Sequence, residues 1–272
     1  MRIDEVPPVD VRGSLTAQRG RLLSLLAALG DAQWAAPTAA PQWSVKDITL
    51  HLLDVDLSWL ARKRDRNRTG NIPVPSGHEE FVRWLGQRNQ RWVDGTRTLS
   101  PRLITDLLQW SGAQFDTHLG TLDLARPSSV YWAGEAPLWF DLAREFTERW
   151  VHYQQIREAA RPAGRDNQPD EYLPLVLRTF IWGFPHQYQA PAPAGTTIAL
   201  EIADIGTWRL TRTATGWTLD EGRAATPAAS LQMTGGAAWR LLTGAPYDAR
   251  QVQPSGEPAL TEPLVRVRGI IV

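Results

Sequence analysis

The sequence predicts a mainly α-helical N-terminal part followed by a small α+β module. Apolar residues recur at helical spacing through the first two thirds of the chain. An Ala/Pro-rich stretch, QAPAPAGTT at residues 189–197, then interrupts this pattern. Beyond it the apolar residues alternate with a period of two, which is typical of strands. We therefore expect a helical domain over residues 1–188 and a separate α+β domain over residues 196–272.

The helices of the first part are bounded by cap and break residues. Ser44 is a good N-cap, and Asp47 three residues later completes a capping-box pattern. Gly30 ends the first helix, and a Gly/Pro-rich break covers residues 69–77. A last helix is interrupted by Pro174 and by the segment 183–185. The predicted helices span residues 11–29, a segment that follows the Ser44 cap within residues 41–66, and residues 79–93, 101–119, 141–160 and 170–187.

The second part combines strands with two short helices. TIALEIA and TWRLTRT alternate, TGWTL follows a turn at Gly216, and SLQMTG is a fourth strand candidate. AAWRLLTG is an amphipathic helix ending at Gly244, and the segment 257–269 is predicted to contain another helix. These elements make a small α+β module of about 80 residues.

The composition excludes several classes of protein and of site. The chain has 272 residues, a formal net charge of zero and no cysteine. The neutral charge predicts no nucleic-acid partner, and no apolar run is long enough for a membrane helix. Acidic residues and prolines fill the N-terminus where a signal peptide needs an apolar core, so we expect a cytoplasmic protein. Without cysteine, any metal must be held by His, Asp or Glu.

The five histidines are the remaining candidates for chemistry. Glu148 and His152 lie one turn apart on one predicted helix, and such a pair can chelate one ion. Spacing alone leaves two interpretations open. The polar neighbours of this pair suit a solvated helix face, and His51 suits a hydrogen-bonded boundary position. The same polar face equally suits a catalytic metal site, which keeps an open coordination position. His118 and His186 are interpreted as ordinary polar positions. His78 and Glu79 begin like an HExxH zinc motif, but Val82 stands where its second histidine would be.

Two segments resemble a known family. WSVKDITLHL at residues 43–52 and TERWVHYQQIR at residues 147–157 are similar to the mycothiol-dependent maleylpyruvate isomerase family, which belongs to the DinB-like four-helix-bundle metalloproteins. The resemblance implies a DinB-like bundle over residues 1–188, in which His51, Glu148 and His152 bind a divalent metal, usually zinc. The segment 207–245 resembles the sterol-carrier-protein-like C-terminal module of that family. An arginine of this module contributes to catalysis in the isomerase, and the sequence leaves five open: Arg209, Arg240, Arg250, Arg266 and Arg268.

The resemblance implies a metal-dependent enzyme that uses a low-molecular-weight thiol such as mycothiol. It would isomerise an electrophilic small molecule or add the thiol to it. Two alternatives remain open: a thiol S-transferase of detoxification on the same scaffold, and a non-catalytic small-ligand-binding or regulatory protein. The expected partners are a small thiol and an electrophilic substrate, with no nucleic acid and no membrane, and the expected state is a monomer or homodimer.

Overall fold

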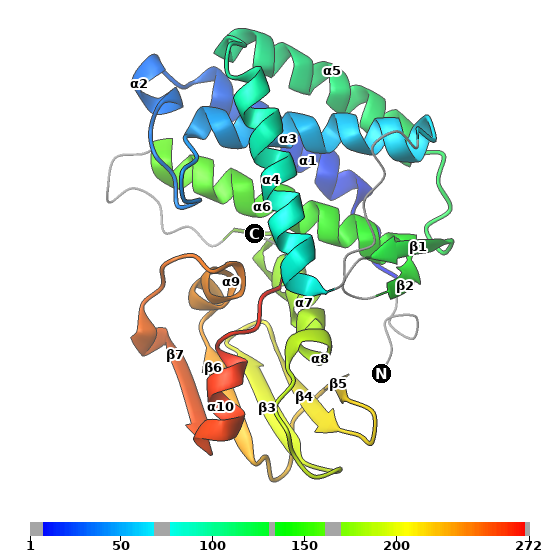
Figure 1. The fold of residues 1–272 in the computed structure, drawn as a ribbon, viewed down its shortest axis with the longest axis vertical. Coiled ribbons are helices and arrows are strands. Elements are labelled where there is room, and N and C mark those ends of the chain that lie inside the picture. The colour runs from blue at the N-terminus through cyan, green and yellow to red at the C-terminus, as the bar shows by residue number, and fades with distance from the viewer. Residues whose placement is uncertain (1–7, 68–76, 131–133, 161–169, 270–272) are drawn as a thin grey trace. The chain divides into compact units, whose positions relative to one another are not determined.

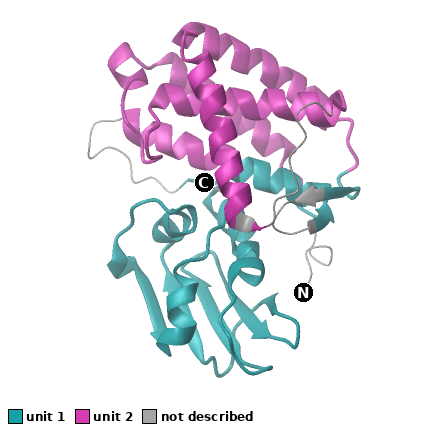
Figure 2. Cartoon of the chain, viewed as in Figure 1, with its two compact units in different colours: residues 1–9, 124–147, 167–272 teal, residues 10–123, 148–166 magenta. Residues whose placement is uncertain are grey.

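The computed structural model describes residues 8–67, 77–130, 134–160 and 170–269. The chain divides into two compact units (Figure 2). The helical unit consists of residues 10–123 and 148–166, and the sheet unit consists of residues 1–9, 124–147 and 167–272. Most of the predicted Gly/Pro break at 69–77 lies outside the described residues.

Five helices share the core of the helical unit. The core is one apolar cluster, whose buried members include Leu22, Leu26, Ile48, Ile104 and Ile156. The helices contributing to it are α1 (Arg12–Ala27), α3 (Val45–Trp59), α4 (His78–Thr96), α5 (Pro101–Leu119) and the second half of α6 (Leu138–Ala160). Among these helices, α4 crosses α3 in Figure 1. A single-turn helix, α2 (Asp31–Trp34), connects α1 to the segment before α3.

The start of α3 is fixed by the predicted capping box. The Asp47 amide donates to Ser44 Oγ at 3.2 Å, and the Ser44 amide donates back to Asp47 Oδ2 at 3.0 Å. The reciprocal bonds satisfy two backbone donors that the first turn would otherwise leave without partners. They also set the register of α3, which places His51 on its second turn. A π-helical turn at Leu60–Arg64 extends the helix at its other end.

The sheet unit is built around a five-stranded sheet in the order β5-β4-β3-β6-β7. Its strands are β3 (Thr197–Ile202), β4 (Gly206–Arg212), β5 (Trp217–Glu221), β6 (Ala229–Met233) and β7 (Val252–Gly256). The strands β3 and β6 are parallel and the other neighbours are antiparallel. One face is buried, and it includes Ile198, Leu200, Leu210, Leu219 and Leu231. Helices α8 (Phe184–Gln187) and α10 (Pro258–Leu264) pack against the sheet.

The remaining elements of this unit are short. A hairpin of two strands precedes α6. A two-turn helix, a 3-10 turn and a one-turn helix precede the first strand of the sheet. They are β1 (Pro127–Val130), β2 (Gly134–Pro137), α7 (Leu173–Phe180), a 3-10 turn (Ile181–Gly183), α8 (Phe184–Gln187), α9 (Gly235–Thr243), a second 3-10 turn (Ala249–Gln251) and α10 (Pro258–Leu264). Gly244 has φ of 73°, a left-handed value that glycine adopts without strain, and it ends α9 as predicted.

The fold class predicted from the sequence is confirmed, because an N-terminal helical region precedes a C-terminal sheet with short helices. The sequence did not predict the hairpin of β1 and β2, the small helix α2, the edge strand β7 or the 3-10 turn at Ala249–Gln251. The predicted division into domains at residues 189–195 stays a prediction. Within the described residues, no helix combines the length and apolar composition needed to cross a membrane.

Candidate metal centre

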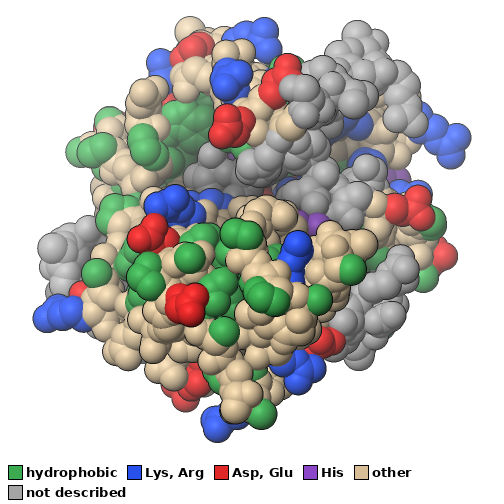
Figure 3. Space-filling model, turned by 60° about the horizontal axis from the view of Figure 1, so that its bottom comes forward, with side chains coloured by type: hydrophobic (Ala, Val, Ile, Leu, Met, Phe, Trp, Pro, Cys, Tyr) green, Lys and Arg blue, Asp and Glu red, His purple; other side chains and the backbone are tan. Residues whose placement is uncertain are grey.

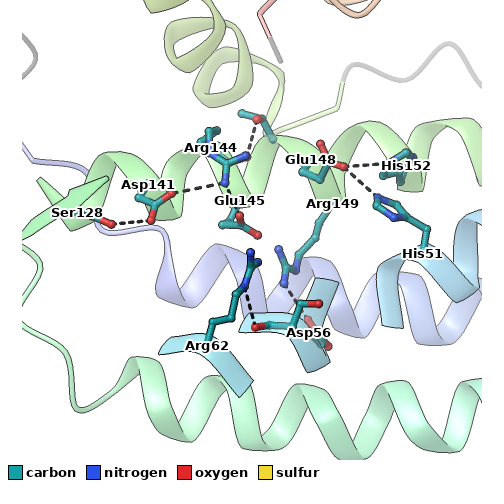
Figure 4. Close-up of polar contacts among 12 residues, drawn as sticks. His51, Asp56, Arg62, Ser128, Asp141, Arg144, Glu145, Glu148, Arg149 and His152 are labelled. Atoms are coloured by element: carbon teal, nitrogen blue, oxygen red, sulfur yellow. Dashed lines mark hydrogen bonds and ion pairs between the residues drawn. The ribbon is translucent and has the colours of Figure 1, made fainter. Parts of the chain in front are cut away.

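Three side chains from two helices of the helical unit converge on one point (Figure 4). His51 projects from α3, and Glu148 and His152 project from successive turns of α6. His51 Nε2 lies 3.1 Å from Glu148 Oε1, and His152 Nε2 lies 3.2 Å from the same oxygen. All three potential ligand atoms lie within 4.8 Å of one another. Ligand atoms about 3.3 Å apart are expected around a tetrahedral zinc ion with bonds near 2.0–2.1 Å.

The other ring nitrogen of His152 has a defined partner. His152 Nδ1 lies 2.8 Å from Gln155 Oε1, and a carbonyl oxygen only accepts hydrogen bonds. His152 Nδ1 therefore carries the proton, so in the neutral imidazole Nε2 presents a lone pair towards Glu148. With Nδ1 held by Gln155, Nε2 is the nitrogen of His152 that is left to bind a metal ion beside Glu148, 3.2 Å away. The donor set therefore fits a divalent metal.

The electrostatics keep these groups ready to hold a cation. Burial lowers the pKa of His51, although the hydrogen bond to Glu148 opposes this effect. His51 therefore keeps a neutral ring at neutral pH. Burial on its own would raise the pKa of Glu148, but the hydrogen bonds and charges of His152 and His51 outweigh it and hold that pKa well below its usual range. Glu148 is thus an ionised carboxylate at neutral pH.

The two histidines of the triad are largely shielded from solvent, and Glu148 is more exposed. The side chains of His51 and His152 are 5% and 8% exposed, whereas that of Glu148 is 17% exposed. The ring of Trp43 lies 5.0 Å from that of His51 and is held by a 2.9 Å hydrogen bond from its Nε1 to Gln90 Oε1. Because Trp43 excludes water there, it strengthens the electrostatic interactions of the site.

The polar face of α6 is buried, which corrects the solvated interpretation of that face. Asp141, Glu145, His152 and Gln155 are all less than 9% exposed, and the apolar side of the helix is buried as well. Ser128 Oγ donates to Asp141 Oδ2 at 2.7 Å, so this buried acid is satisfied inside the protein (Figure 4). His51 is 4% exposed, so it is a buried residue and not a boundary one.

A second polar contact joins the same two helices. Arg149 Nη2 donates to Asp56 Oδ1 at 2.8 Å (Figure 4). Ser111 Oγ of α5 donates to Asp56 Oδ2 at 3.0 Å. Arg19 of α1 approaches the same carboxylate at 3.6 Å and donates to Asp116 at 2.6 Å. The network ties four helices together next to the triad.

The structure separates the triad from the other histidines. His118 lies on α5 and His186 on α8, and in the described part of the chain neither joins a group of three potential ligands. The side chain of His78 lies outside the described residues. Gln155 and Trp43 were not predicted as parts of the site, although Gln155 stands one turn from His152 and Trp43 directly precedes the cap of α3.

Comparison with known proteins identifies the family. Residues 15–157, more than half of the chain, match the mycothiol maleylpyruvate isomerase N-terminal domain. The chain belongs to this family. The match includes all three residues of the triad and ends before the C-terminal module, so the likeness to sterol carrier proteins stays a prediction.

Two crystal structures of the mycothiol-dependent maleylpyruvate isomerase, one of them a mutant, have a similar fold. They are 15% and 14% identical to this chain, with TM-scores of 0.58 and 0.57, and each comparison covers 94% of this chain and 97% of the other. At this identity the likeness concerns the fold. No curated protein matches the chain.

Proposed function

We propose that the protein is a metal-dependent enzyme that uses a low-molecular-weight thiol of the mycothiol type to isomerise an electrophilic small molecule. The supporting observation is the convergence of His51 Nε2, His152 Nε2 and Glu148 Oε1 in a member of this family. We propose these three residues as ligands of a divalent metal such as zinc. Three protein ligands leave at least one position for a further ligand, as in catalytic zinc sites.

A divalent ion held there would supply positive charge that favours the thiolate form of a bound thiol. The residues of the chain set the size of that charge. Histidine binds a metal as a neutral imidazole, so the two histidines would leave it unchanged, and the Glu148 carboxylate would neutralise one unit. The partial exposure of Glu148 provides the side from which a thiol can approach.

The nucleophile of this reaction comes from outside the chain, because the sequence contains no cysteine. In an isomerisation the thiolate adds to a carbon–carbon double bond, and rotation about the resulting single bond follows. Expulsion of the thiolate then restores the double bond with the other geometry. The thiol is therefore regenerated, and the electron pair that formed the carbon–sulfur bond leaves with the sulfur.

Calorimetry with mycothiol tests the proposal. The zinc-loaded protein should bind the thiol and release a proton on binding, because the metal takes the thiolate. Chelated protein and the His152→Ala variant should show neither effect. His186→Ala is the matched control, because it removes a histidine of the sheet unit and should leave zinc content and thiol affinity unchanged.

The outcomes separate the proposal from its alternatives. Equal thiol affinity with and without metal would overturn the metal-dependent mechanism. A stable thioether product formed in stoichiometric amounts from thiol and electrophile would identify an S-transferase instead. Regeneration of the free thiol after each turnover supports the isomerase.

Three further proposals accompany this function. We place the protein in the cytoplasm, because a reaction through a free thiol needs a compartment that keeps small thiols reduced; cell fractionation tests this. We expect no nucleic-acid binding, since the net charge is zero and the face in Figure 3 intersperses both signs of charge; a filter assay tests it. Limited proteolysis of the full chain tests the domain division, because cleavage within residues 189–195 should yield two resistant fragments.

A further inference from the structure

The two histidines of the triad differ in how their outer ring nitrogens are held. His152 Nδ1 lies 2.8 Å from Gln155 Oε1, three residues further along α6. His51 Nδ1 is buried and has no hydrogen-bond partner among the described residues. Only His152 is therefore fixed in tautomer and in ring orientation by a neighbouring side chain.

We propose that Gln155 is a positioning residue for the metal ligand His152. This inference rests on the proposed function, in which the triad holds a divalent ion. The Gln155 carbonyl accepts the Nδ1 proton and thereby directs the Nε2 lone pair of His152 at the point shared with His51 and Glu148. Groups that hold the outer nitrogen of a metal-bound histidine orient the ring and raise its basicity.

Burial makes this contact rigid. Gln155 is 2% exposed and His152 is 7% exposed, so water does not replace either partner freely. The ring of His152 also stands edge-on to that of His51, with 4.9 Å between the centroids, which limits its rotation from the other side. The histidine is thereby held in its metal-binding orientation before an ion arrives, and the ion does not have to order it.

A neutral amide in this position has a consequence for the charge of the site. Glu148 is the one carboxylate in the triad, so a bound divalent ion keeps one net positive charge. A carboxylate at position 155 would accept the same proton, but it would place a second negative charge one imidazole away from the metal. The amide therefore orients His152 while leaving the positive charge that favours a bound thiolate.

Substitutions of Gln155 separate positioning from simple packing. Gln155→Met keeps the length and burial of the side chain and removes the acceptor. It should weaken zinc binding by about 10- to 100-fold, the usual effect of losing such an outer partner. Gln155→Glu keeps the acceptor and should bind zinc at least as tightly as the native protein. The same variant should bind thiol less tightly when zinc-loaded, because the added charge reduces the preference for the thiolate.

The control is Gln18→Met. Gln18 lies on α1, is 2% exposed, and its amide atoms have no hydrogen-bond partner in the described part of the chain. The substitution therefore removes an equally buried amide of the same unit without touching a ligand, and zinc affinity should stay unchanged. Zinc affinity is measured by competition with a chromophoric chelator. The His152 Nδ1 proton is followed by NMR in zinc-saturated protein, where it should exchange slowly in the native protein and rapidly in Gln155→Met.

The results distinguish failure of this inference from failure of the proposed function. If the native protein and Gln18→Met bind zinc but Gln155→Met binds it equally well, Gln155 does not position His152 and the metal site stands. If Gln155→Met and Gln155→Glu both lose zinc to the same extent, the role of Gln155 is packing and the inference is wrong. If the native protein holds no zinc, the proposed function itself fails.

Discussion

Replacing Asp56 by alanine should destabilise the helical unit strongly, because Asp56 is the buried centre of its polar network. Asp56 is 2% exposed and accepts hydrogen bonds from Arg149 at 2.8 Å and from Ser111 at 3.0 Å. Arg19 lies 3.6 Å away with only 10% of its side chain exposed, and the Arg149 side chain is 9% exposed. The substitution leaves two nearly buried guanidinium groups with one carboxylate fewer.

The magnitude follows from burial. Removing one member of a buried ion pair costs about 3–5 kcal/mol, because the remaining charge is poorly solvated. A loss of this size is a large part of the total stability of an ordinary domain, which is roughly 5–15 kcal/mol. Replacing Arg149 by methionine in the same chain should recover part of the loss, with a coupling energy on the order of 1–3 kcal/mol.

Urea denaturation of the metal-free proteins, followed by circular dichroism, measures both quantities. Asp106→Ala is the control, since it removes an ion pair with Arg102 whose side chains are 64% and 93% exposed, and it should leave the midpoint unchanged within error. A loss below about 1 kcal/mol for Asp56→Ala, or no recovery with Arg149→Met, would show that the network does not stabilise the bundle.

Two further predictions concern a helix cap and a buried hydroxyl. Ser44→Ala should cost about 1 kcal/mol of stability in urea denaturation and weaken zinc binding, because the cap sets the register of α3 ahead of His51; Ser100→Ala, which removes the corresponding cap of α5, should affect stability alone. Burial raises the pKa of Tyr188 from 10.0 to about 12, and its hydroxyl donates to the Leu260 carbonyl at 2.8 Å. Because the folded protein favours the neutral hydroxyl, this stabilisation is complete below pH 10.0 and is lost as the pH rises towards 12. Tyr188→Phe should remove that alkaline loss when the unfolding midpoint is measured against pH. A pH dependence of the variant identical to that of the native protein would contradict this prediction.

The elements that could be predicted from the sequence are those with local signals. The capping box of Ser44 and Asp47 and the left-handed Gly244 fix helix ends through their own geometry. The alternation in residues 197–212 predicts β3 and β4, because one face of each strand is buried. The strand β7 has no such signal: it is an edge strand with Pro254 inside it, and four of its five residues are exposed.

The polar face of α6 shows why the site could be predicted only in part. A helical wheel places Glu148, His152 and Gln155 together, but it does not contain the partners that make their burial possible. Those partners lie on other helices far away in the sequence, such as His51, 97 residues from Glu148. The buried network of Asp56 and Arg149, 93 residues apart, depends in the same way on tertiary packing. The triad was predicted through the family resemblance, whereas the role of Gln155 required the geometry.

The metal is expected to contribute less to folding than a structural zinc ion does. Two polar contacts join α3 to α6: one between His51 and Glu148, and one between Asp56 and Arg149. The second contact does not involve the triad and remains when the ion is removed. The triad also supplies three ligands, whereas structural zinc sites are closed by four. Treatment with a chelator should therefore leave the helical content intact. Removing the ion should lower the free energy of unfolding only by the amount that binding to the folded state contributes. That amount is about 2.7 kcal/mol for an ion present at 100 times its dissociation constant. Circular dichroism of native and chelated protein measures both effects, with His152→Ala as the variant that chelation should not change. Loss of helical structure on chelation would show that the ion holds the bundle together, and would count against a catalytic centre with an open position.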